Sequence, residues 1–115
     1  MSDSKLNKIN LSTRLDFRPY SQVSDSFCQN EPMAERIMRI LMNAYDSPII
    51  LARKTTYHVE ILVKGKNINR DSVWSLFRCD SELTDICPYI EAIGSLDLGQ
   101  GPFVLISLEL KELQK

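Results

Sequence analysis

His58 is the only histidine in the chain, so catalysis by a Ser–His or Cys–His pair would have to use it. It stands in a stretch of alternating residues, on the polar side beside Glu60. A small enzyme or ligand-binding domain would use His58 together with a nearby carboxylate. A single histidine in the middle of a strand is more often a surface side chain. We therefore expect no catalytic residues and keep the enzyme as the third of three hypotheses.

The three cysteines, Cys28, Cys79 and Cys87, are the other reactive side chains. With His58 they could form a Cys₃His zinc site, but the spacings of 51 and 8 residues contain no Cys-x-x-Cys knuckle. Their odd number also argues against a disulfide framework and suits a reducing compartment. We expect no metal, no cofactor, and residence in the cytoplasm or nucleus. The apolar runs are far shorter than the ~20 residues of a membrane helix, so no membrane partner is expected.

The basic residues are unevenly distributed, although the net charge is only −1. Residues 51–70 carry five basic side chains against one acid, and residues 71–115 carry eight acids against three bases. A basic hairpin of this kind could attract an anionic partner such as nucleic acid. The alternative is that these are solvated strand ends, which also discourage aggregation. The basic residues are Arg53, Lys54, Lys64, Lys66 and Arg70.

The elements that would position these side chains belong to one domain. The chain has 115 residues, 43% of them hydrophobic and 25% charged, which is ordinary globular usage. Residues 1–9 are polar and expected to be flexible, and residues 10–115 to form a single α+β domain. Alternating or continuous apolar runs predict strands over 11–17, 48–53, 57–64 and 103–110.

Two helical regions complete the pattern. Asn30 or Glu31 should begin the first helix, and Asn67 or Asn69 should cap the second, which continues through a shorter helix after Asp80. Residues 20–30 read as a loop, and residues 89–96 as either a helical turn or a short strand. The order strand, helix, strand, strand, helical region, strand matches a ferredoxin-like split βαβ sandwich. Such a fold has a four-stranded antiparallel sheet with two helical segments on one face, and right-handed crossovers would place the first and third strands centrally.

The first helix has more apolar surface than one sheet can cover. Its apolar arc spans roughly 200°, about twice what a helix on a sheet requires. The surplus could be covered by residues 20–29 or 82–93, or it could form an interface. The side chains that widen the arc are Ala34, Met38, Met42 and Tyr45.

We therefore expect a small non-catalytic protein–protein interaction module, a regulatory adaptor that binds another protein or itself as a homodimer through the Ala34–Met38–Met42–Tyr45 surface. Methionine side chains adapt readily to such contacts. The alternative is a nucleic-acid-binding module that uses the basic hairpin and the polar sheet face, where Phe103 could stack a base. The middle strand lacks the aromatic-rich signature of an RNA-recognition motif, which weighs against that alternative.

Overall fold

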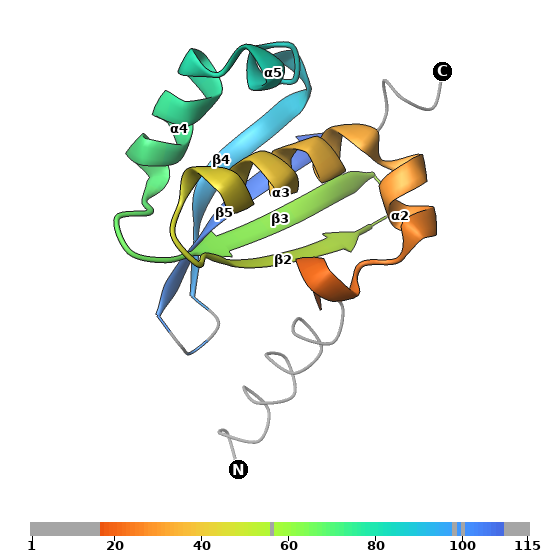
Figure 1. Cartoon of the computed structure of the whole chain (residues 1–115), viewed down its shortest axis with the longest axis horizontal. Helices are drawn as coiled ribbons and strands as arrows, with labels where there is room; N and C mark the ends of the chain where they lie inside the picture. Colours follow the sequence, from red (N-terminus) through yellow and green to blue (C-terminus); the bar gives the residue numbers. More distant parts are fainter. Residues whose placement is uncertain (1–16, 56, 98, 100, 110–115) are drawn as a thin grey trace.

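The structure of the protein is a computed structural model that describes residues 17–55, 57–97, 99 and 101–109. The segment 1–9 and most of the strand expected over 11–17 lie outside these residues. The described chain is a mixed α+β fold built on an open antiparallel sheet of five strands, in the order β1-β2-β3-β5-β4 (Figure 1). The strands are β1 (Arg18–Pro19), β2 (Ile49–Lys54), β3 (His58–Lys64), β4 (Ile90–Asp97) and β5 (Pro102–Glu109).

This sheet differs from the four-stranded ferredoxin-like order expected from the sequence. The short strand β1 lies at an edge and pairs antiparallel with β2, and β3, the third strand of the predicted order, lies at the centre as expected, between β2 and β5. Residues 90–97 form an additional edge strand, which resolves the helix-or-strand ambiguity of that segment. The sheet therefore consists of two antiparallel hairpins, β2–β3 and β4–β5, that meet at the β3–β5 pair.

Side chains satisfy free backbone amides at the start of α4 (Arg70–Cys79) and α5 (Ser81–Thr84). Asn69 and Ser72 form a reciprocal capping box on α4, and Asp80 caps α5, both as the sequence predicted. The long helix α3 (Pro32–Ala44) has Glu31 as its N-cap residue, one of the two predicted starts, without a side-chain cap; the other, Asn30, ends α2 (Asp25–Asn30). Two short 3₁₀ helices complete the set, η1 (Tyr20–Gln22) and η2 (Cys87–Tyr89). No helix in the described part of the chain has the length and hydropathy that crossing a membrane requires.

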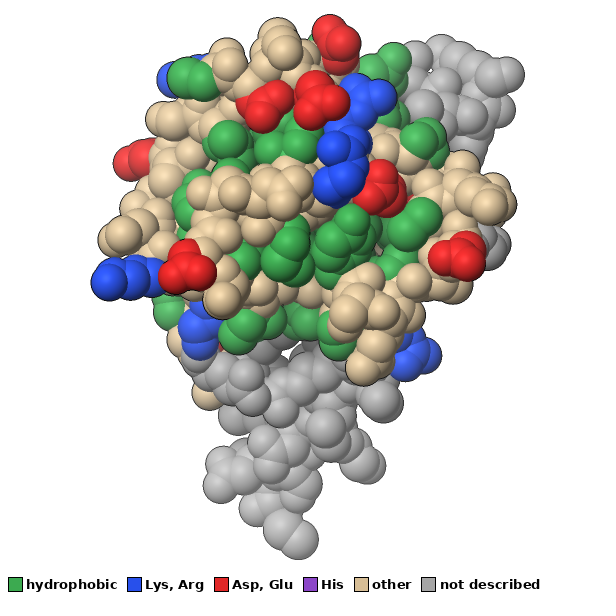
Figure 2. All heavy atoms as spheres, in the orientation of Figure 1, with side chains coloured by type: hydrophobic (Ala, Val, Ile, Leu, Met, Phe, Trp, Pro, Cys, Tyr) green, Lys and Arg blue, Asp and Glu red, His purple; other side chains and the backbone are tan. Residues whose placement is uncertain are grey.

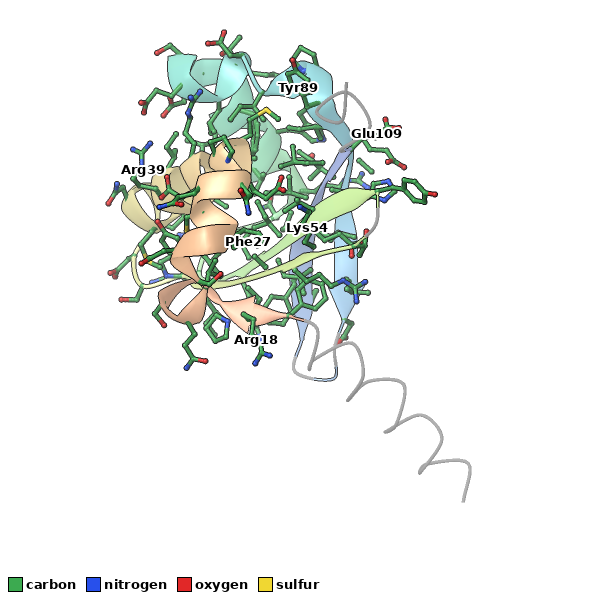
Figure 3. All side chains as sticks on the ribbon, turned by 90° about the vertical axis from the view of Figure 1, so that its right-hand side faces the viewer. Arg18, Phe27, Arg39, Lys54, Tyr89 and Glu109 are labelled. Carbon is green, nitrogen blue, oxygen red and sulfur yellow. The ribbon has the colours of Figure 1, made fainter. Side chains whose placement is uncertain are left out.

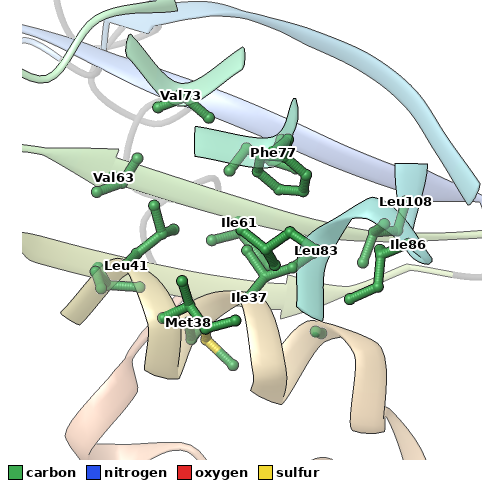
Figure 4. Packing of buried hydrophobic residues seen from close by; sticks show 14 of the residues in the cluster. Ile37, Met38, Leu41, Ile61, Val63, Val73, Phe77, Leu83, Ile86 and Leu108 are labelled. Atoms are coloured by element: carbon green, nitrogen blue, oxygen red, sulfur yellow. The ribbon is translucent and has the colours of Figure 1, made fainter. Parts of the chain in front are cut away.

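The helices cover one face of the sheet and bury the main core between the two layers. Figure 4 shows side chains of α3, α4 and the segment after it meeting those of the central strands. Burying each large apolar side chain contributes about 1.5–3 kcal/mol, so this layer is the main source of stability. A smaller cluster of Phe17, Leu62 and Phe103 is buried on the other face of the sheet. Fully buried members of the main core include Ile37, Met38, Leu41, Ile61, Phe77, Leu83 and Leu108.

Candidate protein-binding surface

The surface predicted on α3 is divided by the chain itself. Ala34 and Met38 are both 0% exposed. The segment 20–30, expected to be a loop, folds into η1 and α2, which lie beside α3 (Figure 1). Partly buried side chains of this segment, Tyr20 and Phe27 among them, pack against the core cluster that contains Ala34 and Met38. Neither of these two residues is therefore available on the surface of the folded chain.

Local interactions explain why this segment folds. The Ser24 side chain accepts a hydrogen bond of 3.0 Å from the Phe27 amide and so caps α2. The Tyr20 hydroxyl donates to the Glu35 carboxylate at 2.8 Å, which ties η1 to α3. Lys54 of β2 forms a 2.7 Å ion pair with Glu31, whose side chain is only 6% exposed at the α2–α3 junction. The segment 20–30 is therefore anchored to α3 near its first residue and to β2 just after its last.

The last turn of α3 has no such cover. Met42 is 39% exposed, whereas Tyr45 is partly buried and its hydroxyl donates to Ser72 Oγ at 3.1 Å. Met42 borders a hollow of about 230 Å³ at the outer edge of β2, which we call the Met42 groove. Its lining is predominantly apolar and consists of Pro19, Tyr20, Ser21, Met42, Pro48, Ile49, Ile50 and Leu51. On the face that carries α3, Figure 2 shows hydrophobic atoms gathered in a band below a cluster of charged side chains.

Ile49 is the residue of this groove that sequence reasoning missed. The continuous apolar run 48–53 predicted a central, buried strand, but Ile49 is 53% exposed. The reason is that Ile49 alternates with the buried Ile50, so its side chain lies on the face of the sheet away from the main core, which carries only the smaller cluster. A continuous apolar run indicates burial on both faces of a sheet, but β2 is buried mainly on one.

The basic hairpin is divided into two groups by the register of its strands. Because Ile49 pairs with Lys64, and Lys54 with Val59, Lys64 lies at the opposite end of the hairpin from Arg53 and Lys54. Lys66 follows Lys64 in the turn after β3, and Arg70 begins α4.

Arg53 and Lys54, at one end of the hairpin, are both paired with acidic side chains of the same chain. Arg53 Nε lies 2.6 Å from Glu60 Oε1, and Lys54 is paired with Glu31. Phe103 is 4% exposed and so cannot stack a base. Nucleic-acid binding stays a prediction, but without that aromatic side chain.

His58 and the cysteines lie on different parts of the fold. His58 Nε2 contacts the carboxylate of Glu91 across the sheet. Cys28 is on α2, Cys79 ends α4, and Cys87 begins η2, and all three are free thiols. Burial raises the pKa of the Cys28 thiol, and the charges of nearby carboxylates raise it further. No group of side chains that could hold a metal ion is present in residues 17–109 as far as they are described.

Comparison with protein-family models, with curated proteins and with solved structures finds no match to this chain.

Proposed function

We propose that this protein is a small non-catalytic protein–protein interaction module, a regulatory adaptor that binds a partner through the Met42 groove. The observation that carries the proposal is that Met42 and Ile49, two exposed large apolar residues, both line one hollow at the edge of the sheet. Tyr57 is the one other exposed large apolar side chain among the described residues, and it lies outside that lining. Apolar side chains grouped around a hollow are typical of recognition surfaces, whereas scattered ones are not.

The occupant that fits is a short extended segment of another protein. A hollow of about 230 Å³ is smaller than the roughly 300–1,000 Å³ of most small-molecule sites, so it suits one or two side chains. Each partner of a stable dimer buries roughly 800 Å², so a second copy of this chain would need further contacts outside the groove. The outer edge of β2 at Ile49 also leaves room for an extended chain, as in binding at a sheet edge.

Homodimerisation and location belong to the same proposal. A second copy could insert its own apolar segment into the groove, and light scattering decides whether it does. Residence in the cytoplasm or nucleus is supported by the three free cysteines, which a reducing compartment maintains.

The test is a selection of random linear peptides on the full chain, followed by affinity measurements with variants. We expect selected peptides to lose about tenfold or more in affinity with Met42→Glu or Ile49→Glu, because a charge would enter an apolar contact worth roughly 1.5–3 kcal/mol. Fluorescence anisotropy with each peptide measures the loss, and circular dichroism confirms that each variant is folded.

Tyr57→Glu is the matched control, since it places the same charge on an exposed apolar position away from the groove. It should leave every affinity within about twofold, as for a surface change outside the contact. Equal affinity of all variants for the peptides would contradict the proposal, and so would a strict monomer on which no peptide is enriched. A dimer that dissociates with Ile49→Glu but not with Tyr57→Glu would assign the groove to a second copy.

A further inference from the structure

We propose that the partner bound in the Met42 groove also carries a carboxylate, which enters a second hollow on the other side of β1. This inference rests on the proposed function and adds the chemistry of the partner. The second hollow, which we call the Arg18 cavity, has a volume of about 200 Å³. Its lining comes from β1, η1, α2 and β2 and consists of Arg18, Gln22, Val23, Ser24, Phe27, Ala52, Arg53 and Lys54.

The lining combines an apolar body with a basic rim. Val23, Phe27 and Ala52 supply the apolar part, and three of the eight lining residues are basic while none is acidic. Figure 3 labels Arg18 on β1, Phe27 on α2 and Lys54 on β2, the three sides from which the cavity is built. A ligand that satisfies such a lining has a hydrocarbon portion and a negative charge.

Two of the three cations are held in place by carboxylates that lie outside the lining. Glu31 pairs with Lys54 and fixes its position. The Arg53 guanidinium pairs with Glu60 and lies over the Phe17 ring on the other face of the sheet, so a ligand in the cavity would meet Arg18 and Lys54 and not this group. Lys54 has three N–H donors, one of which reaches Glu31, and its side chain is 47% exposed. The Arg18 side chain is exposed, and the structure shows no hydrogen bond or ion pair between its guanidinium and another described residue. An arginine guanidinium can bind an incoming carboxylate through two parallel hydrogen bonds.

Size favours a carboxylate side chain over a larger anion. The cavity is smaller than most small-molecule sites, so a nucleotide would not fit inside it. A glutamate or aspartate side chain, or the carboxyl terminus of a peptide, would place its methylene groups against Phe27 and its charge at Arg18 and Lys54.

The position of the cavity links it to the groove. The Met42 groove is lined by residues 48–51 of this edge, and the Arg18 cavity by residues 52–54. With a rise of about 3.3 Å per residue, the two hollows lie roughly 10 Å apart along β2. β1 lies between the two hollows, because Arg18 lines the cavity and Pro19 lines the groove. A partner that fills both would therefore pass over β1 and carry an apolar and an acidic side chain roughly 10 Å apart.

The experiment is an NMR titration of the isotope-labelled full chain with phenylacetate and with its neutral isostere phenylacetamide. We expect phenylacetate to shift the backbone amides of Val23, Phe27 and Ala52, and phenylacetamide to bind about tenfold more weakly or not at all. Arg18→Gln should weaken phenylacetate by about tenfold, because it removes the charge but keeps a side chain of similar length. Higher salt should weaken binding to the wild type more than binding to this variant.

Arg70→Gln is the matched control. It removes the same charge from an exposed position at the start of α4, at the other end of the hairpin, and should leave the affinity unchanged. Equal binding of the acid and the amide, or equal weakening by both arginine variants, would overturn the inference. Shifts that map to other parts of the chain would overturn it as well.

The failures of the two proposals can be told apart. One outcome is that binding of the selected peptides depends on Ile49, is unaffected by Arg18→Gln and needs no acidic residue in the peptide. In that case the groove is a binding site, and the inference that the partner carries a carboxylate is wrong. If phenylacetate binds in the cavity while Ile49→Glu has no effect on any peptide, the proposed function is wrong and the cavity stays a carboxylate site.

Discussion

Met38 and Met42 are the same residue type, one turn apart on α3, and their surroundings are opposite. Met38 is 0% exposed and Met42 is 39% exposed. The segment 20–30 covers the helix beside Met38, whereas beside Met42 its residues Tyr20 and Ser21 leave an open hollow. The apolar arc of α3 is therefore buried at Met38 and exposed at Met42, which lies one turn further along the helix.

The comparison shows what a wide apolar arc can and cannot indicate. It correctly indicates that something other than the sheet must cover the helix, because exposed apolar area of that size is costly. It does not indicate whether the cover comes from the same chain. Here the covering segment has few apolar side chains, and Tyr20, Val23 and Phe27 pack against the main core.

The largest effect is expected from a charge at the covered position. Met38→Glu would bury an unpaired carboxylate and should lower the free energy of unfolding by more than about 4 kcal/mol. Met38→Ala, which removes only volume, should cost about 2–5 kcal/mol. Urea denaturation followed by circular dichroism measures both. A loss below about 1 kcal/mol for either variant would mean that the cover over Met38 opens freely in solution.

A smaller effect is expected when the cover itself is weakened. Phe27→Ala removes an anchor of α2 that is only partly buried, so we expect a loss of about 1–3 kcal/mol. Hydrogen exchange should then accelerate in α2 while the amides of β3 stay protected, because α2 can open without the sheet. Phe27→Leu keeps most of the apolar contact and serves as the control. Unchanged exchange in α2 with Phe27→Ala would show that other residues hold the cover.

The hydrogen bond between η1 and α3 makes the cover sensitive to alkali. Burial, and then the Glu35 carboxylate that accepts its hydrogen bond, raises the pKa of Tyr20 from 10.0 to about 12. Above pH 10 the unfolded chain loses this proton while the folded chain keeps it, so this contribution is complete below pH 10 and disappears as the pH rises to about 12. Because Tyr20 is partly exposed, we expect the loss to be on the order of 1 kcal/mol.

Tyr20→Phe isolates that contribution from the other tyrosines. The variant should be less stable than the wild type by about 1 kcal/mol at neutral pH, since it lacks the hydrogen bond to Glu35. Its stability should also decline less steeply between pH 10 and 12. Denaturation curves at several pH values measure the difference. Parallel declines in the two proteins would mean that Tyr20 titrates equally in the folded and unfolded states.

Much of the fold could be predicted from local patterns. Alternation identified β3 and β5, and the capping signals at Asn69 and Asp80 identified α4 and α5, because each depends on neighbouring residues. β4 could not be recognised from alternation. A bulge between Ile90 and Ala92 shifts its register, so Ile90 and Ile93, which pair with Leu108 and Ile106, belong to the main core although they are three residues apart, a spacing typical of a helix.

The candidate site was only partly predictable, because local patterns identify single elements and not the contacts between them. Met42 could be found from helical periodicity, which is a local property. The exposure of Ile49 depends on the second face of the sheet being covered only by a small cluster, and the Arg18 cavity depends on residues of α2 and β2 that line it together. Both are consequences of contacts between segments far apart in the sequence, which periodicity does not describe.

The smallest effect on stability should come from Met42→Glu, and this completes the comparison with Met38→Glu. Met42 is exposed in the groove, so a charge there can remain in water and should change the free energy of unfolding by less than about 0.5 kcal/mol. The two variants have the same chemistry one turn apart, and urea denaturation under identical conditions measures the difference between them. If Met42→Glu destabilises the chain as strongly as Met38→Glu, then the last turn of α3 is covered in solution and the groove is closed. If it leaves stability unchanged and abolishes peptide binding, the exposed methionine contributes to recognition and not to folding.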